Sequence, residues 1–488
     1  MIKVYNTLSG KKEEFVPFDE GKVKMYVCGL TVQNYSHVGH IRSAVNYDVI
    51  RRYLEYRGYD VYFVMNFTDI NEKIVQRARQ EEMTPENLAD KYTRAYLEDI
   101  DQMNIKRADA YCTATVNIEQ MIKIIEGLVE NGYAYEVEGN VYFSVEKFSD
   151  YGKLSGRNLE DMDAGSRVGV NEEKKHPLDF ALWKKAPVED VRVWDSPWGP
   201  GWPGWHIECS AMAAKLLDKR IDIHGGGTDL IFPHHENEIA QSEACFGEKP
   251  FVKYWLHNGT IDMKGEKMSK SLGNFFTTRE LLQKFTADEI RYFLLSKHYH
   301  SPVDFSLEEI ENSAVSWHKI MNTKQEVEQI VEQVPKKSDL SFNVGEFLQE
   351  LDSFRDSFAE AMDDDFNTAR AIGVINNLTG KMNSLINRKS FKVSEETRFV
   401  LKKAVDLLDT FLEVLGFAAG AEESSMFRDD KLTGSLLDYI LDLREQARED
   451  NNWELADQIR DDLDKMGISV KDTTHGPVWS IEDDEYGS

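Results

Sequence analysis

The chain is poor in cysteine and lacks any long apolar run. Its 488 residues include four cysteines, Cys28, Cys112, Cys209 and Cys245, and none of them forms a CxxC pair. Sparse thiols of this kind do not build a disulfide framework, and they fit a reducing compartment with metal-binding or core roles. No apolar stretch approaches the ~20 residues of a membrane helix, and the first residues resemble neither a secretion signal nor a transit peptide. The sequence therefore predicts a cytoplasmic protein without a membrane span.

Positive charge is also scarce. The chain carries 58 Lys and Arg residues against 86 Asp and Glu residues, a formal net charge of −28. Composition alone argues against a nucleic-acid partner. Phosphates are nevertheless bound by local basic surfaces, so clustered Lys and Arg side chains would still allow an RNA partner.

The segments that are present predict several domains around a parallel sheet. At roughly 100–200 residues per domain, the length allows about three or four domains. Residues 22–28 have the pattern of a short buried strand, residues 41–56 that of an amphipathic helix, and residues 61–67 that of a second strand. This order is typical of parallel nucleotide-binding sheets, which collect ligand groups at the carboxyl ends of their strands, where Cys28 and Thr68 fall.

The pattern changes twice further along the chain. Residues 110–202 contain a helical stretch, the hairpin-like EVEGNVYFSVE and a segment rich in Gly, Pro and Trp, which together predict an insertion that splits the sheet. The sheet is expected to resume near His206. From about Phe342 the chain is helical, and a last helical hairpin is expected over about 432–465. One apolar stripe in this part predicts packing rather than a binding surface: Phe347, Leu351, Phe354, Phe358 and Met362.

Four residues suited to binding a soft metal are scattered along the chain. His234 and Glu238 stand one helical turn apart, which puts both on one helix face, while Cys28 and Cys209 would have to join them from other elements. Zinc favours a mixed set of thiolate, imidazole and carboxylate ligands, and such a site could distinguish a thiol from a hydroxyl. The alternative is that each cysteine is a small core residue, as we expect for Cys112 and Cys245. The sequence alone does not decide whether the four residues meet.

Two short motifs are suited to handling phosphate. The quartet HVGH at 37–40 lies between the first strand and its helix, where backbone N–H groups and the helix dipole favour an anion. The segment KMSKS at 267–271 puts two lysines where they could stabilise charge on a transferring phosphoryl group. Each motif alone is weak, since the basic segment also has the pattern of an exposed turn, but the two reinforce each other.

Together these motifs resemble the class I aminoacyl-tRNA synthetases, and longer motifs narrow the resemblance to the cysteinyl-tRNA synthetase family. The matching segments run through essentially the whole chain: MYVCGLTVQNYSHVGHIRS, NFTDINEKI, SPWGPGWPGWHIECSAM, IDIHGGGTDLIFPHHENEIAQSEA, KMSKSLGNF, AMDDDFNTARA and NNWELADQIRDDLDKMGI. HVGH replaces the commoner HIGH and changes one aliphatic residue.

The resemblance implies a role for each matching residue. The implied ligands of one zinc ion per chain are Cys28, Cys209, His234 and Glu238. The implied contacts of the amino acid are Gly29, Thr68 and Trp205. The implied contacts of ATP are His37, His40, Gly226, Asp229, Lys267 and Lys270, of which the two histidines and two lysines are also the implied catalytic residues.

The resemblance further implies an activity and an architecture. The activity is ATP-dependent ligation of L-cysteine to tRNA(Cys) through a cysteinyl-adenylate, with Mg²⁺ accompanying ATP and zinc recognising the thiol. The expected fold is a Rossmann-like α/β catalytic domain with a parallel sheet split by an insertion, followed by an α-helical bundle and a small C-terminal domain, in a monomer. The expected ranges are 1–110 and 205–265 for the catalytic domain, 111–204 for the insertion, 266–335 for the KMSKS and stem-contact region, 336–420 for the bundle, and 430–488 for anticodon binding.

Two other functions stay open at this level. The ligase that joins cysteine to an amino sugar in mycothiol synthesis shares the zinc and signature motifs, but its chain is shorter. The C-terminal region, in which Trp453, Asp457 and Arg460 share one helix face and Trp479 follows, favours the synthetase because aromatic and Arg side chains suit unpaired bases. The alternative for each tryptophan is packing within a small helical hairpin. A noncatalytic tRNA- or zinc-binding relative would carry degraded signature motifs, and both motifs are intact here.

Overall fold

The computed structural model describes most of the chain. The described residues are 1–158, 173–186, 192–263, 266–267, 276–335, 342–418, 439–441, 443–444, 446–448, 452–465, 468–473 and 476–481. They fall into two compact units, Met1–Ala419 and Gly420–Ser488. None of the helices in the described residues is both long and apolar enough to cross a membrane.

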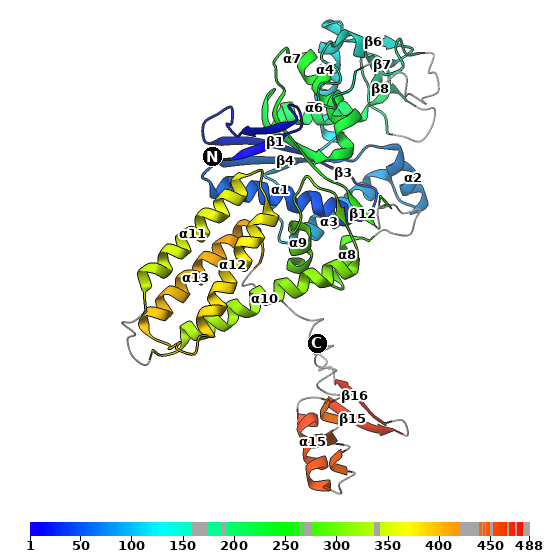
Figure 1. The fold of residues 1–488 in the computed structure, drawn as a ribbon. Helices are drawn as coiled ribbons and strands as arrows, with labels where there is room; N and C mark the ends of the chain where they lie inside the picture. Colours follow the sequence, from blue (N-terminus) through cyan, green and yellow to red (C-terminus); the bar gives the residue numbers. More distant parts are fainter. Residues whose placement is uncertain are drawn as a thin grey trace. The chain divides into compact units, whose positions relative to one another are not determined.

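A parallel sheet of five strands, in the order β11-β10-β3-β4-β5, forms the centre of the larger unit (Figure 1). Strands β3 and β4 carry the long apolar runs expected of a sheet that is buried on both faces. One hydrophobic core includes Met25 and Phe63, and a second core includes Tyr26 and Val64, so neighbouring residues of one strand enter opposite cores. The strands are β3 (Lys22–Thr31), β4 (Asp60–Thr68), β5 (Ala110–Thr113), β10 (Ile221–Gly227) and β11 (Val252–Asn258).

Helix α1 (Val38–Tyr56) connects β3 to β4, and it begins earlier than the apolar pattern predicts. Its first turn is held by a reciprocal cap. The His37 ring accepts a hydrogen bond from the backbone N–H of Gly39 at 3.1 Å, and the ring of His40 accepts one from the N–H of His37 at 3.4 Å. The two histidines of HVGH therefore cap the start of α1 beyond the carboxyl end of β3.

An insertion lies between β5 and β10, and its buried residues share one hydrophobic core with Tyr26 and Val64 of the central sheet. It contains α4 (Ile118–Glu130) and an antiparallel sheet of four strands. These are β6 (Ala134–Val137), β7 (Asn140–Phe143), β8 (Phe180–Lys185) and β9 (Gly201–Pro203), of which β6 and β7 form the expected hairpin.

One sequence expectation is wrong here. The sheet does not resume near His206, because this residue lies in α6 (Trp205–Leu216), and the next strand of the sheet begins at Ile221. Helix α6 packs against both α4 and α7 (Glu236–Phe246) and is buried along most of its length. A helix buried on nearly all sides has no single apolar stripe, so its sequence gives no helical period to detect.

Beyond β11, the chain forms a small sheet and then a helical bundle. The small sheet pairs β12 (Ile261–Met263) with β13 (Glu266–Lys267) and with β14 (Val303–Asp304). Two short helices precede β14, α8 (Thr278–Leu282) and α9 (Ala287–Leu295). The bundle helices are α10 (Leu307–Glu332), α11 (Val344–Asp363), α12 (Thr368–Ile386) and α13 (Glu395–Val414), and the predicted stripe packs inside, with Phe358 stacked on Phe411 at 4.1 Å.

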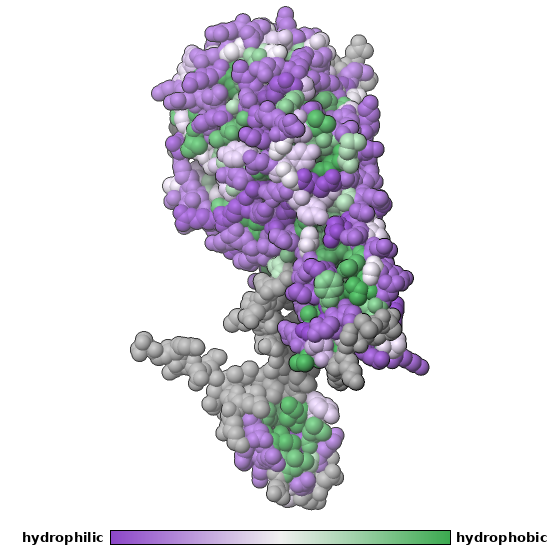
Figure 2. Space-filling model, turned by 90° about the vertical axis from the view of Figure 1, so that its left-hand side faces the viewer, coloured by the Kyte–Doolittle hydropathy of each residue, from purple (hydrophilic) through white to green (hydrophobic). Residues whose placement is uncertain are grey.

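The smaller unit has its own modest core. Leu441 and Leu463 form its buried cluster. Helix α15 (Trp453–Lys465) is followed by a hairpin of β15 (Ile468–Thr473) and β16 (Gly476–Ile481). Hydrophobic residues gather on its visible surface in Figure 2, and its exposed large side chains include Tyr439, Leu443, Trp453 and Leu455. The predicted fold class, an α/β parallel sheet with an insertion and a helical C-terminal part, is confirmed.

Candidate active site and metal centre

A cavity of about 520 Å³ opens at the carboxyl ends of the central strands. Its walls come from the end of β3, from the first turn of α1, and from the ends of β10 and β11. This is where a doubly covered parallel sheet places its ligands. The predicted residues that line the cavity are Cys28, Gly29, His37, His40, Trp205 and Asp229.

The four predicted metal ligands converge at one end of this cavity. Cys28 Sγ lies 3.6 Å from Cys209 Sγ and 3.6 Å from Glu238 Oε1, and His234 Nε2 lies 3.2 Å from the same Glu238 oxygen. The ligand atoms of all four residues lie within 4.8 Å of one another. Ligands at zinc distances with tetrahedral angles are about 3.3–3.8 Å apart. Two thiols, an imidazole and a carboxylate at these separations fit a single zinc ion.

Burial keeps these ligands away from water. Cys209 and His234 are each 1% exposed and Glu238 is 0% exposed, whereas Cys28 is half-buried and faces the cavity. Burial raises the pKa of the Cys28 thiol well above its usual value and lowers the pKa of His234 well below it. The imidazole of His234 is therefore neutral, which is its metal-binding form.

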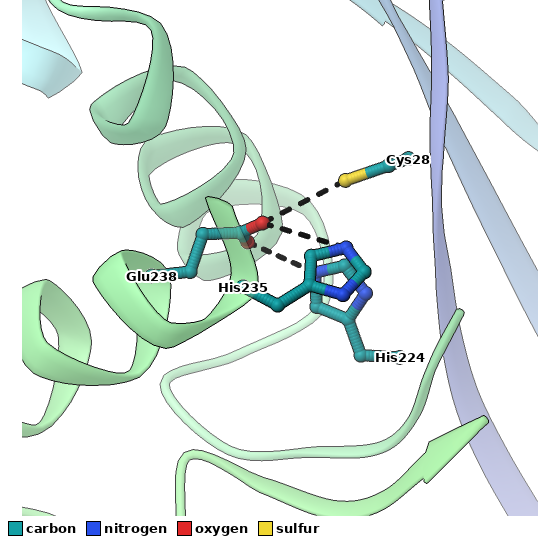
Figure 3. Close-up of side chains that lie close together, drawn as sticks. All are labelled: Cys28, His224, His235 and Glu238. Carbon is teal, nitrogen blue, oxygen red and sulfur yellow. Dashed lines mark hydrogen bonds and ion pairs between the residues drawn. The ribbon is translucent and has the colours of Figure 1, made fainter. Parts of the chain in front are cut away.

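Three further histidines lie behind the carboxylate of Glu238. Figure 3 shows Cys28, His224 and His235 arranged around Glu238, a set that could also hold a metal by distance alone. His224 Nε2 donates to Glu238 Oε2 at 2.9 Å, the oxygen opposite the one that faces His234. His235 Nε2 is farther from the carboxylate, 3.9 Å from Oε1, and its Nδ1 pairs with His257 at 2.8 Å.

This arrangement favours the set with Cys209 and His234 as the metal ligands. In that set, His224 orients Glu238 through its second oxygen, in the way that ligating carboxylates are normally supported by a neighbour. Thr7 continues the chain of contacts, because its Oγ1 lies 2.7 Å from His257 Nδ1. His257 thus links His235, the neighbour of His234 in the sequence, to Thr7 near the N-terminus.

The residues predicted to hold the amino acid lie around the metal end. Trp205 is 40% exposed, and its ring lies 4.2 Å from the ring of His234, centroid to centroid. Gly29 packs so closely on β4 that a Cβ at this position would lie 1.7 Å from the carbonyl oxygen of Asn66. Only glycine allows this approach, which brings the backbone of β3 to the cavity wall.

Thr68 differs from the other two residues predicted to contact the amino-acid substrate, because it does not line the cavity. It ends β4 and is buried at 3% exposure, and its Oγ1 donates to Glu208 Oε2 at 2.8 Å. Burial raises the pKa of the Glu208 carboxyl well above its usual value. Thr68 thus links the end of a sheet strand to the helix that carries Cys209.

The opposite end of the cavity carries the predicted phosphate residues. The rings of His37 and His40 are stacked at 3.7 Å between centroids and are half-exposed at the start of α1. A helix start with partly exposed imidazoles is suited to an anion.

The glycines of HGGGTD let the end of β10 pass close to its neighbours. A Cβ at Gly226 would lie 2.8 Å from Leu230 and 2.9 Å from His235, and Tyr47 holds this residue through hydrogen bonds to both its N–H and its carbonyl. Asp229 follows at the cavity wall in the turn after β10. Gly226 itself is buried behind that wall.

The two lysines of KMSKS are only partly covered by the structure. The backbone of Lys267 lies in β13, opposite Asp262 of β12. Lys270 lies outside the described residues. Their roles stay predictions.

Sequence reasoning missed several residues of the site. Glu208 was not singled out, although a carboxylate inside the otherwise apolar helix WHIECSAMAAKL is the signal that points to it. His224, His235 and His257 were not assigned roles either. Their roles depend on contacts between β10, α7 and β11, and no spacing in the sequence encodes those contacts.

Comparison with known families matches three parts of the chain. Residues 14–315 match the family described as the class I (C) tRNA synthetase catalytic domain. Residues 357–419 match the DALR domain, and residues 437–479 match the cysteinyl-tRNA ligase anticodon binding domain.

Several curated proteins are similar over nearly their whole length. The chain is 47% identical over 478 residues to the cysteine–tRNA ligase of Carboxydothermus hydrogenoformans, covering 98% of this chain and 99% of that protein. It is 47% identical to the cysteine–tRNA ligase of Thermococcus onnurineus over 482 residues, 98% of each chain. It is 48% identical to that of Pelotomaculum thermopropionicum over 485 residues, 98% of this chain and 99% of the other.

Solved structures of more distant proteins share the fold. Mycobacterium tuberculosis methionyl-tRNA synthetase in complex with methionyl-adenylate superposes with a TM-score of 0.64 at 17% identity, over 81% of this chain and 91% of that one. A protein from Campylobacter jejuni described as a putative arginyl-tRNA synthetase gives a TM-score of 0.54 at 14% identity, over 81% and 93% of the two chains. At such identities the likeness supports the fold alone.

Proposed function

The chain belongs to the cysteine–tRNA ligase family of class I aminoacyl-tRNA synthetases, and from this membership we propose that it charges tRNA(Cys) with L-cysteine through a cysteinyl-adenylate. The observation that supports the proposal most strongly is the pairing of two ends in one cavity. Four zinc-type donors lie at one end, where Cys28 lines the cavity, and the stacked rings of His37 and His40 lie at the other.

The metal end of the cavity, called the thiol end from here because it would bind the substrate thiol, would select the amino acid. Cys28, Cys209, His234 and Glu238 would hold zinc, and bound zinc would supply a soft Lewis acid for the substrate thiolate. Serine offers a harder and less acidic oxygen at the same place. A polar site built for one group rejects an analogue that lacks it much more strongly than a shape-based pocket does. Trp205 would form an apolar wall beside the substrate.

The phosphate end would promote adenylate formation. An oxygen of the cysteine carboxylate attacks the α-phosphorus of magnesium-bound ATP, the bond to the bridging oxygen breaks, and pyrophosphate leaves. No side-chain nucleophile is needed, so positioning and charge stabilisation by His37, His40, Lys267 and Lys270 supply the catalysis. Asp229 would receive the adenosine by accepting hydrogen bonds from its hydroxyl groups, and Gly226, buried behind the wall, would let the end of β10 pass close to its neighbours there.

The second step transfers the amino acid to tRNA. A hydroxyl of the terminal adenosine attacks the cysteinyl carbonyl carbon, and AMP leaves. The segment 437–479 would contact the anticodon, in keeping with the family that it matches. Action as a monomer in the cytoplasm completes the proposal.

The test compares two transcripts. The purified protein is incubated with labelled cysteine, ATP and an unmodified tRNA transcript carrying the cysteine anticodon GCA, beside a transcript altered only in the anticodon. We expect charging of the first and a marked loss on the second. Absence of charging by folded, metal-loaded protein would refute the proposal.

The amino-sugar ligase of mycothiol synthesis is the nearest rival. It shares the cysteine-activating chemistry, so pyrophosphate exchange alone does not separate the two. The match of residues 437–479 to an anticodon-binding family favours tRNA as the acceptor. Supplying the amino-sugar acceptor in place of tRNA gives the direct comparison, and we expect no product.

A further inference from the structure

Arg42 is a fully buried cation two residues beyond HVGH. It is 1% exposed, and its guanidinium donates to four backbone carbonyls: those of Gly259 at 2.7 Å, Thr260 at 2.6 Å and Tyr299 at 3.2 Å, and that of Ser301. Burial lowers its pKa to about 10, so the side chain stays charged at neutral pH. These bonds occupy both terminal nitrogens, while Nε has no hydrogen-bond partner within the described residues. A buried charge is retained where such bonds offset its desolvation.

The four carbonyls belong to one junction. Residues 259 and 260 connect β11 to β12, and residues 299 and 301 precede β14, the parallel neighbour of β12. The two segments touch so closely that a Cβ at Gly259 would lie 2.4 Å from the carbonyl oxygen of Ser301. Two backbone hydrogen bonds also join the segments, from the Gly259 N–H to the Tyr299 carbonyl and from the Val303 N–H to the Thr260 carbonyl, each at 2.9 Å. Arg42 adds a charged donor that binds carbonyls of both segments at once.

This junction leads directly to one of the lysines predicted to act on ATP. Strand β12 follows the junction at Ile261, and Asp262 of β12 is the register partner of Lys267 in β13. On its other side, the junction contributes Gly259, Thr260 and Ile261 to the wall of the cavity. The carbonyls bound by Arg42 thus fix both a cavity wall and the base of the strand pair that carries Lys267.

The far end of the KMSKS segment is attached to the same helix. The N–H of Val38 donates to the carbonyl of Phe276 at 3.3 Å, and the N–H of Thr278 donates to the carbonyl of Ser36 at 3.0 Å. The Ser36 and Thr278 hydroxyls also lie 2.5 Å apart. The described residues on both sides of KMSKS are therefore tied to the start of α1, one side through backbone bonds and the other through Arg42.

We propose that Arg42 is a positioning residue for adenylate formation, which sets the distance between HVGH and the strand pair that carries Lys267. The inference rests on the proposed function. Arg42 does not contact substrate in this scheme. It acts through the backbone of residues 259–263, so its loss displaces the phosphate end of the cavity and leaves the metal end in place.

The test uses Arg42→Lys, which keeps the charge and loses the planar fork that reaches several carbonyls. The matched control is Arg291→Lys. Arg291 is also buried, at 0% exposure, and donates to the carbonyls of Met103, Asn104 and Leu415, but at the junction with the helical bundle, where it also pairs with Asp48. Both variants remove a buried guanidinium from a carbonyl cluster, and only Arg42 adjoins the phosphate end.

The measurements are cysteine-dependent ATP–pyrophosphate exchange, zinc content and melting temperature. For Arg42→Lys we expect a fall in kcat of about 10- to 100-fold, the effect of a displacement of roughly 1 Å on oriented groups, with a raised KM for ATP. The KM for cysteine and the zinc content should stay at their wild-type values. Arg291→Lys should lower the melting temperature at least as much and retain the kcat at temperatures where it is folded.

Three results would overturn the inference: an unchanged kcat in Arg42→Lys, an equal fall in both variants, or a rise in the KM for cysteine as large as that for ATP. If the lysine variant does not fold, Arg42→Gln replaces it, because it keeps two donors without a charge to bury, and the same criteria apply. Wild-type exchange is measured in parallel. If the wild-type enzyme shows no exchange, the proposed function fails, and if it exchanges normally beside an active Arg42→Lys, only the role of Arg42 fails.

Discussion

The two ends of the cavity differ in burial and in construction. At the thiol end, Cys209, His234 and Glu238 are almost completely buried, and they come from two helical segments that pack on the sheet. At the phosphate end, His37 and His40 are half-buried, like Cys28, and come from a single helix start. Three of the four thiol-end ligands are thus desolvated, only Cys28 of the four faces the cavity, and the four come from distant parts of the chain, whereas the two histidines of the phosphate end are partly exposed and adjacent in one motif.

Under the proposed function, the difference follows from what each end would recognise. Telling a thiol from a hydroxyl depends on ligands that are fixed and desolvated before the substrate arrives, because a solvated site would accept either group. A triphosphate arrives hydrated and with its own metal ion, and its charge changes during the reaction. Partly exposed donors that meet the charge as it develops suit this task. The comparison predicts that substitutions at the two ends have separable effects on cysteine and on ATP.

The largest effect is expected at the thiol end, with Cys209→Ser. The wild-type ratio of kcat/KM for cysteine over serine should be on the order of 10⁴ or more, and the variant should lose its zinc and most of this ratio. Exchange assays with each amino acid and metal analysis of the purified protein measure both effects. Cys245→Ser is the control, since Cys245 is half-buried beside α4 and away from the cavity. A Cys209→Ser protein that keeps zinc and selectivity would contradict the assignment.

At the phosphate end, we expect His37→Asn to lower kcat for pyrophosphate exchange by roughly 10²–10³-fold, as for removal of one donor to developing charge. Asparagine is a good N-cap, so α1 should keep its start and the melting temperature should change little. Zinc content should equal that of the wild type. His37→Ala serves as the comparison because it loses the cap as well as the ring. If His37→Asn also lost zinc or cysteine affinity, the two ends would not be separable.

The phosphate end could be predicted from the sequence to a greater extent than the thiol end. HVGH lies within one helix turn, so the contiguous motif already encodes its geometry, and the structure adds the reciprocal cap of His37 and His40. The β3-α1-β4 unit could be predicted equally well, because apolar runs mark its elements and Gly58, with a φ of +90°, marks the end of α1. Helix α6 was missed because burial on most sides removes its periodicity.

At the thiol end, the ligand types could be identified but their meeting could not be derived from spacing. Cys28 and Cys209 are 181 positions apart, and only the packing of α6 against β4 and α7 brings them to 3.6 Å. The support of Glu238 by His224, and of Thr68 by Glu208, depends on the same packing. The domain boundaries and the role of Lys270 stay predictions.

A smaller effect at the thiol end is expected for Thr68→Val. The variant keeps the shape of the side chain and removes its hydrogen bond to the buried Glu208. An unpartnered buried carboxyl costs about 1–3 kcal/mol, so the end of β4 should shift and the KM for cysteine should rise about tenfold. The KM for ATP should stay at its wild-type value. Thr68→Ser keeps the hydroxyl and should behave as the wild type, whereas equal defects in both variants would show that the methyl group matters instead.

The smallest effect is expected outside the cavity, for Trp453→Ala in the smaller unit. Trp453 is 56% exposed on α15, where a base could stack on its ring. Stacking contributes about 1–3 kcal/mol per base, so the lower bound corresponds to a rise in the KM for tRNA of about fivefold. Trp453→Phe keeps an aromatic face and should recover most of this loss. Because the residue belongs to a separate compact unit, pyrophosphate exchange without tRNA should be unchanged in both variants. A parallel loss of pyrophosphate exchange would show that the smaller unit influences the cavity. The separate effects expected at the two ends of the cavity would then not depend on the larger unit alone.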